Sequence, residues 1–317
     1  MREAARPGLD GASGGPPAGG GAVGGGLWRD KAGLFGLLVL LALIGVGLLG
    51  PLLSPYDPGA MNLAERLRPP ARLPGGSLTH PLGTDQLGRD VLSRILHGGR
   101  VSLTVGVTVV FATGLIGCAL GLAAGYFRGR VDALVSGFAD IQVAFPGLLL
   151  ALVVLAVIGP SPGGVIVVLI VNGWMAFARL ARALTLSLRE RAFVEGAIIL
   201  GCRPVRVVFR HILPNLASPM LTLAVLEFAR VILAEAALSY LGMGVQPPAA
   251  SWGLDVAQGK SYIFRSWWLV TFPGLALAVT VLGVNLFAGW LQLVTNPHER
   301  EKLLAQSQTA GGAGSGA

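Results

Sequence analysis

Residues 189–215 read RERAFVEGAIILGCRPVRVVFRHILPN, a basic segment that separates two long apolar stretches of the chain. Residues 193–200 have the composition of a short helix. Pro204 is typical of the start of a second helix, where the N–H group that proline lacks has no helical partner in any case. The arginines on both sides favour water over hydrocarbon. The segment therefore predicts a loop with two short helices, outside the membrane.

Apolar runs on both sides of this loop indicate a membrane protein. The chain of 317 residues is 53% hydrophobic and 13% charged, whereas a soluble domain carries about 25% charged residues. A helix needs roughly 20 apolar residues to cross a bilayer core. We therefore predict an all-α integral membrane protein with six transmembrane helices, at residues 32–53, 101–126, 134–158, 164–177, 218–241 and 269–294.

The two ends of the chain differ in composition from this core. Residues 1–30 are rich in Gly, Ala and Pro and contain few bulky apolar side chains, so they cannot bury enough surface to offset the entropy of ordering. We predict a disordered cytoplasmic tail there and another at 299–317. The six-span domain then covers 31–298, with the basic loop at about 182–217.

The distribution of Lys and Arg predicts the orientation. Six spans place both termini on the same side of the membrane. With the termini inside, 15 Lys and Arg residues lie in inner segments and 8 in outer segments, the bias of cytoplasmic loops. We therefore expect both termini and the basic loop to lie in the cytoplasm. A nucleic-acid-binding protein would instead carry its basic residues on a soluble fold.

The spacing inside the basic loop resembles the EAA loop of ABC-importer permeases, in which E-A-A precedes a glycine and a Leu-Pro ending. The matching residues are Glu195, Gly196, Ala197, Gly201 and Pro214. The resemblance implies a coupling helix that docks in a groove of an ATPase subunit, and small residues let that surface approach the backbone. Gly196 stands where Ala is usual, which lowers helix stability by about 1 kcal/mol. From the residues alone, a basic amphipathic loop on anionic lipid is the alternative.

Other segments are similar to the C-type permeases of dipeptide, oligopeptide and nickel importers: LGTDQLGRDVLSR (82–94), DIQVAFPGLLLA (140–151), ALSYLGMGVQPPAASWG (237–253) and WWLVTFPGLALAVTVLGVNL (267–286). In the first, Thr84 or Asp85 is expected to cap a helix. Asp85 with Arg89, and Asp90 with Arg94, have the i,i+4 spacing of ion pairs. The ending of the apolar chain, GWLQLVTNPHER, departs from the family pattern.

This resemblance implies the type I ABC-importer permease fold and the role of one transmembrane half of an ATP-driven importer in the bacterial inner membrane. It implies as partners a B-type permease, two ATP-binding subunits and an extracytoplasmic solute-binding protein. The solute stays open among dipeptides, oligopeptides, glutathione, nickel, opines and sugars. Two other functions also stay open: a transporter driven by an ion gradient, which would carry inverted repeats, and a membrane scaffold.

The sequence predicts no catalytic residue, cofactor site or metal site. Two cysteines and four histidines are scattered without metal-ligand spacing. Gly259, Lys260 and Ser261 resemble the end of a phosphate-binding loop, but the earlier glycine, Gly253, stands one place too early. ATP is therefore expected to be bound by the partner subunits.

The fifth predicted span carries three charged residues, each costing about 2.5–3.5 kcal/mol at the centre of a membrane helix. Glu227 and Arg230 are spaced to pair with each other, and Glu235 is left over. Ionisable residues within a membrane are candidates for function. The span either lines the translocation path, with Glu235 and Arg230 facing water, or carries a charge network that joins helices.

Two further spans contain features with alternative explanations. Gly117, Gly121 and Gly125 form overlapping GxxxG steps in the second span, which we expect to pack within this subunit. Asp140 in the third span either extends to the membrane interface or acts in gating. Pro146, in the same span, is expected to kink the helix.

Overall fold

A computed structural model describes residues 30–295, and that part of the chain is all-helical. The predicted tails therefore lie outside the described residues, except for Asp30. The long helices are α2 Lys31–Leu53, α3 Val91–Phe127, α4 Gly129–Val143, α5 Gly147–Ile158, α6 Pro162–Arg189, α9 Leu213–Tyr240 and α11 Trp268–Thr295. The shorter ones are α7 Ala192–Ile199, α8 Pro204–Val207, α10 Trp252–Gly259, the 3₁₀ turns Leu63–Glu65 and Lys260–Tyr262, and the π turn Val208–Ile212.

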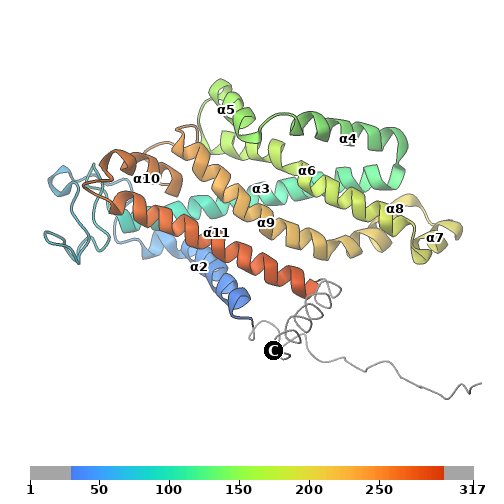
Figure 1. Cartoon of the computed structure of the whole chain (residues 1–317), viewed down its shortest axis with the longest axis horizontal. Helices are drawn as coiled ribbons and strands as arrows, with labels where there is room; N and C mark the ends of the chain where they lie inside the picture. Colours follow the sequence, from blue (N-terminus) through green and yellow to red (C-terminus); the bar gives the residue numbers. More distant parts are fainter. Residues whose placement is uncertain (1–29, 296–317) are drawn as a thin grey trace, which may run out of the picture.

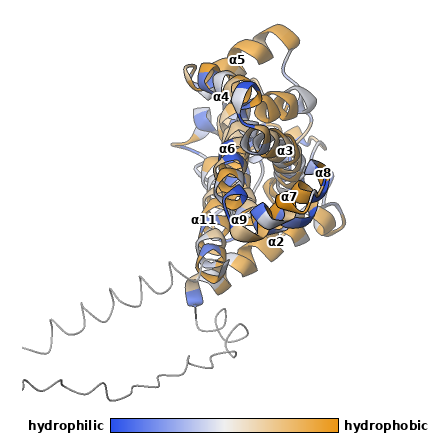
Figure 2. Ribbon diagram, turned by 90° about the vertical axis from the view of Figure 1, so that its right-hand side faces the viewer, coloured by the Kyte–Doolittle hydropathy of each residue, from blue (hydrophilic) through white to orange (hydrophobic). Residues whose placement is uncertain are grey.

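The long helices form an elongated bundle (Figure 1). Helices α3, α9 and α11 follow its long axis, while α2 packs on α3 and α11, and α6 packs on α3 and α9. The loop 54–90 and α10 gather at one end, and α7 and α8 lie at the other. Hydrophobic residues cover most of the helical ribbons (Figure 2), and outward-facing Leu48 and Val157 are 70% and 83% exposed. Such a surface suits contact with hydrocarbon.

Four helices are long and apolar enough to cross a membrane, namely α2, α3, α6 and α11, or five spans if the bent pair α4 and α5 counts as one. The predicted count of six is therefore not confirmed. The difference is α9, a 28-residue helix that carries Glu227, Arg230 and Glu235 and is not among the four. Because α9 lies beside α3 and α11 (Figure 1), it nevertheless runs through the same layer of the bundle.

The third predicted span is not one helix. Helix α4 ends at Val143, α5 begins at Gly147, and the two are bent by 85°. Pro146 occupies the N-cap of α5, since a proline has no N–H to donate and disfavours a helical conformation in the residue before it. The predicted kink is confirmed, but its size makes this a broken or re-entrant segment.

The GxxxG glycines of α3 pack against α6 within the subunit, as predicted. A Cβ atom at Gly117 would lie 2.3 Å from the carbonyl oxygen of Trp174, and one at Gly121 would lie 2.4 Å from that of Ala178. At Gly125 the nearest atom would be Thr185 Cβ at 2.7 Å. Only glycine permits backbones to come this close.

Helices α2 and α11 are antiparallel neighbours. A Cβ at Gly33 would lie 2.6 Å from the Trp290 ring, and one at Gly36 would lie 2.5 Å from the backbone nitrogen of Phe287. Lys31 therefore lies at the same end of this pair as the last turn of α11. An even number of crossings has this consequence, and it is met either by the four long apolar helices or by six crossings that add α9 and the bent pair α4 and α5.

The end of the bundle formed by the loop 54–90 and α10 contains a buried charge network. Arg89 is completely buried, and its Nε donates to Asp85 Oδ2 at 2.6 Å, which confirms that predicted pair. Its Nη2 also donates to Gln258 Oε1 at 2.7 Å. Arg94 does not pair with Asp90. Its Nε donates instead to Oδ1 of Asp255 in α10, at 2.8 Å.

Asp90 is engaged elsewhere because it caps α3. Its carboxylate accepts from the backbone N–H of Ser93 at 2.8 Å and lies 2.9 Å from Nδ1 of His80. The predicted cap at Thr84 or Asp85 is therefore wrong. Residues 84–89 form a turn, and α3 continues from Val91 into the membrane span with no separate interfacial helix.

Candidate functional site

The basic loop folds into two short helices at one end of the bundle (Figure 1). Helix α7, Ala192–Ile199, follows the predicted 193–200 closely, and Pro204 begins α8 with Arg203 as its extended N-cap. The main difference lies before the loop, because α6 continues to Arg189. A π turn then joins α8 to α9, so the loop is continuous with two long helices.

One face of α7 is anchored in the bundle. Val194 is fully buried and Ala197 is 8% exposed, and both belong to an apolar cluster with Leu122 and Tyr126 of α3. Ala197 therefore faces this subunit's own core. Its small size suits that packing rather than the approach of another protein, which corrects one part of the sequence interpretation.

Gly201 ends α7 in a Schellman motif. Its φ is +77°, in the left-handed region. The N–H of Cys202 donates to the carbonyl of Ala197 at 3.1 Å, and the N–H of Gly201 donates to that of Ile198 at 3.0 Å. Only glycine adopts this conformation without a Cβ penalty. The glycine is thus required by the turn that ends the helix, a reason that its spacing alone did not reveal.

The opposite face of α7 is exposed and apolar. Phe193 is 52% exposed, Ile199 is 79% exposed and Leu200 is 85% exposed. Glu195 lies among them, also exposed, and forms no ion pair or side-chain hydrogen bond with any of residues 30–295. A helix of eight residues with a free carboxylate and exposed large apolar side chains has the features of a docking surface.

Gly196 and Pro214 complete the set of predicted residues. A Cβ at Gly196 would meet no atom within 4 Å, so space around its backbone is open to another surface. Pro214 is exposed in the first turn of α9, beyond the π turn. The structure therefore places Glu195 and Gly196 on α7, Gly201 in the turn that ends this helix, and Pro214 in the first turn of α9.

The connection between α6 and α7 is held by Arg189. Its Nη1 donates to the backbone carbonyl of Tyr126 at 2.6 Å, and its guanidinium lies 5.3 Å from the centre of the Tyr126 ring. The end of α6 is thereby fixed to the end of α3. Helix α7 consequently projects from a base made of two long helices.

The charged residues of α9 form a second candidate site. Arg230 Nη1 donates to Glu227 Oε1 at 2.7 Å, as predicted, and the Arg230 side chain is 74% exposed whereas that of Glu227 is 11% exposed. An exposed arginine on a helix that crosses a membrane requires water or a protein partner. The Glu227–Arg230 pair therefore marks a surface of α9 that hydrocarbon alone would not solvate.

Glu235 does not face water in this subunit. It is fully buried, and its Oε1 accepts from Ser239 Oγ at 2.7 Å and from Ser251 Oγ at 3.0 Å. Ser251 is the N-cap of α10. Glu235 thus joins α9 to the loop before α10, as the alternative interpretation expected.

Asp140 lies in an exposed ion pair near the bend of the third span. Its Oδ1 is 3.1 Å from Nη2 of Arg179 in α6, and both side chains are more than half exposed. The pair links α4 to α6. This geometry fits a carboxylate that extends to the interface, and a gating role stays a prediction.

Two family models match the chain. One is described as a binding-protein-dependent transport system inner membrane component and matches residues 117–301. The other is described as the N-terminal TM domain of oligopeptide transport permease C and matches residues 26–70.

Curated relatives extend over most of the chain. The di/tripeptide transport system permease protein DppC of Pseudomonas aeruginosa is 38% identical over 269 residues, which are 85% of this chain and 89% of the relative. The dipeptide transport system permease protein DppC of Escherichia coli is 40% identical over 269 residues, 85% of this chain and 90% of the relative.

A solved structure supports the fold. An inward facing conformation of the MetNI methionine ABC transporter matches with a TM-score of 0.52 at 17% identity, covering 64% of this chain and 97% of that chain. This similarity concerns the fold alone, and it agrees with the predicted importer-permease architecture.

Proposed function

This chain belongs to the family of binding-protein-dependent transport system inner membrane components, ABC-importer permeases of the bacterial inner membrane that lack an ATPase site, and we propose that it carries peptides. The relatives that cover most of its length are named for dipeptides or di- and tripeptides. The observation that carries the mechanism is α7, anchored on one face and apolar and exposed on the other.

The proposed assembly contains a B-type permease, two ATP-binding subunits and an extracytoplasmic solute-binding protein. The described chain has one docking helix of this kind, α7, while two ATPase subunits need two docking sites. A second permease would supply the other. In the proposed topology both termini and α7 lie in the cytoplasm, and the excess of Lys and Arg in those segments supports this orientation.

In the proposed mechanism, α7 transmits the movement of the ATPase. Phe193 and Leu200 insert into the partner, and Glu195 pairs with a donor there. Because Val194 and Ala197 pack against the ends of the long helices, a displacement of α7 moves those helices with it. The π turn and α8 carry the same movement into α9. Alternating access follows as a rigid-body rearrangement.

Arg230 and Glu227 are the proposed contribution of α9 to the translocation path. Peptides carry a carboxylate and an ammonium group, and Arg230 still has guanidinium donors beyond the one given to Glu227. A water-filled path or the second permease would also solvate this exposed cation. Glu235 is not part of this proposal, because its carboxylate is buried.

The decisive test is uptake by the reconstituted complex. Proteoliposomes that contain both permeases and the ATPase subunits, supplied with binding protein, should accumulate a labelled dipeptide only with ATP, and vanadate should abolish uptake. Transport that follows an ion gradient and ignores vanadate would instead identify a secondary transporter.

The variant Glu195→Ala tests the role of α7 within that assay. We expect loss of peptide-dependent ATP hydrolysis and uptake with normal assembly of the permease pair. Glu190→Ala is the matched control, because Glu190 is an exposed carboxylate just before α7 whose one ion pair within residues 30–295 is with exposed Arg128, at 2.9 Å, and such pairs contribute little. Equal activity of the two variants would contradict the proposed docking.

A further inference from the structure

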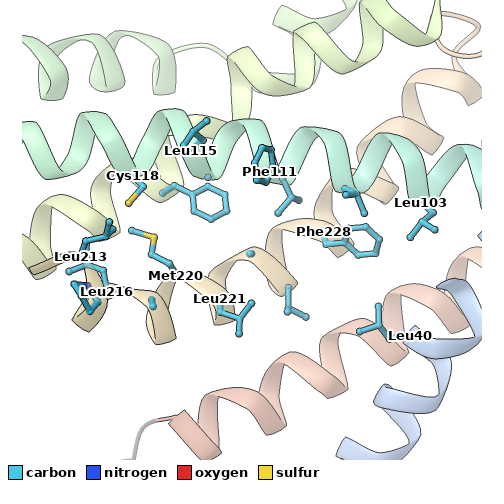
Figure 3. A pocket seen from close by; sticks show the side chains of 18 of the residues that line it. Leu40, Leu103, Phe111, Leu115, Cys118, Leu213, Leu216, Met220, Leu221 and Phe228 are labelled. Carbon is cyan, nitrogen blue, oxygen red and sulfur yellow. The ribbon is translucent and has the colours of Figure 1, made fainter. Parts of the chain in front are cut away.

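A long apolar groove lies between α2, α3 and α9 (Figure 3). It encloses about 840 Å³, within the range of small-molecule sites. Cys118 of α3 faces Leu213 and Met220 of α9 across it. From Leu213 to Phe228 the groove follows α9 for about 22 Å at a rise of about 1.5 Å per residue, more than the roughly 15 Å depth of one leaflet.

A basic pocket adjoins one end of the groove. This second cavity is lined by Arg203, Arg206 and Arg210, and it shares the side chains of Phe209 and Pro214 with the apolar groove. The three arginines are exposed, and none forms an ion pair with a carboxylate of residues 30–295. Their positive charge therefore lies beside the mouth of the groove with no internal counterion in this region.

We propose that this composite cavity binds one anionic phospholipid, with its phosphate at Arg206 and Arg210 and an acyl chain in the groove. Neither half of the cavity favours this ligand by itself. An apolar groove between helices would accept any hydrocarbon or another helix, and exposed arginines would accept many anions. Together they match a molecule with a negative head and a long apolar tail, and basic pockets between membrane helices are established sites for anionic headgroups.

The cavity lies beside the segment that joins α8 to α9, through which the proposed movement of α7 reaches the long helices. Phe209 lies in the π turn between α8 and α9, and Pro214 lies in the first turn of α9. A bound lipid would fill the space between α3 and the start of α9 and stabilise their separation. This inference concerns the surface of the chain itself and holds whichever solute the complex carries.

The two native cysteines provide a direct probe. Cys118 lines the apolar groove, Cys202 lines the basic pocket, and both are free and partly exposed. In a Cys202→Ser background, Cys118 is the only thiol of this chain. The complex is purified in detergent, stripped of lipid and treated with a maleimide, and the labelling rate of this chain is measured while phosphatidylglycerol or phosphatidylcholine is titrated.

We expect phosphatidylglycerol to slow labelling of Cys118 at concentrations where phosphatidylcholine has little effect. Arg206→Gln and Arg210→Gln should each raise the phosphatidylglycerol concentration needed by about fivefold, the contribution of one basic residue near an anionic headgroup. Arg130→Gln is the charge-matched control. Arg130 is an exposed arginine in the first turn of α4, and it lines neither cavity.

A second pair of variants tests the groove by volume. Ala224 lines it from α9, so Ala224→Phe should reduce the phosphatidylglycerol that remains with the purified complex. Ala278→Phe adds the same bulk to an exposed position of α11 and should not.

Three results would overturn the proposal. Equal protection by both lipids would show that the arginines do not select the headgroup. Protection of Cys118 in the lipid-free complex would show that a helix of a partner subunit fills the groove. Unchanged lipid retention in Ala224→Phe would show that no acyl chain lies there.

Discussion

Replacement of Gly201 by alanine should uncouple peptide uptake from ATP hydrolysis, although the added methyl group contacts no other atom. A Cβ at Gly201 would meet no atom within 4 Å, so the cost is conformational rather than steric. At a φ of +77° an L-residue pays about 1–2 kcal/mol. That penalty lowers the equilibrium constant between the ordered and the frayed helix end by a factor of about 5 to 30.

The structural consequence falls on the docking surface. The Schellman hydrogen bonds from Gly201 and Cys202 hold the last turn of α7, where Ile199 and Leu200 are most exposed. If that turn frays, the proposed apolar contact with the ATPase is lost first. We therefore expect Gly201→Ala to reduce ATP-dependent uptake, by up to about thirtyfold, while ATPase subunits still hydrolyse ATP without peptide.

Gly196→Ala is the matched control within the same helix. It also has no atom within 4 Å of the added Cβ, but its backbone is helical, so alanine stabilises α7 by about 1 kcal/mol. Uptake should be unchanged or higher. Gly201→Asn should recover part of the loss, because asparagine tolerates the left-handed region.

The assay is uptake of labelled dipeptide and phosphate release, measured in the same proteoliposomes. The reasoning fails if Gly201→Ala transports like the unmodified chain, or if the alanine and asparagine variants are equally impaired. The second result would mean that the partner requires the absence of any side chain at this position.

Three further substitutions probe the bundle. Arg94→Ala should destabilise the purified chain by about 3–5 kcal/mol, because it leaves Asp255 buried without its counterion; a thermal midpoint like that of the unmodified chain would contradict this. Gly121→Ala should lower the thermal midpoint and the yield, since its Cβ would lie 2.4 Å from a backbone oxygen, whereas Gly45→Ala, with no atom within 4 Å, should not. Arg230→Gln should reduce uptake with normal assembly and normal basal ATPase activity, and unaffected uptake would exclude Arg230 from the path.

Local features of the fold could be predicted from the sequence. The bounds of α7, the proline that begins α8 and the ion pair between Asp85 and Arg89 depend on residues at most four positions apart. A membrane span is likewise predicted from the hydrophobicity of about 20 consecutive residues, without knowledge of the rest of the chain. The GxxxG glycines also packed as predicted, because only a close helix contact explains three small residues on one face.

Features that depend on distant partners could not be predicted. Arg94 has Asp90 four residues away but pairs with Asp255, 161 residues distant, because α3 and α10 meet at the end of the bundle. The sequence offered no partner for the Glu235 carboxylate, because Ser251, which donates a hydrogen bond to it, lies 16 residues further along the chain. A signal for the exposed face of α7 was present in the apolar residues Ile199 and Leu200, directly before the glycine that ends the helix, but the pattern did not say which face was buried.

The sequence by itself determined that this protein is a bundle of membrane helices with a basic loop between two of them, since hydropathy and short-range spacing act within a single segment. Tertiary structure decided which charges are buried, that the third span is bent by 85° and that an apolar groove meets three arginines. These properties arise where helices from distant parts of the chain pack together, and the free energy of that packing belongs to no single segment.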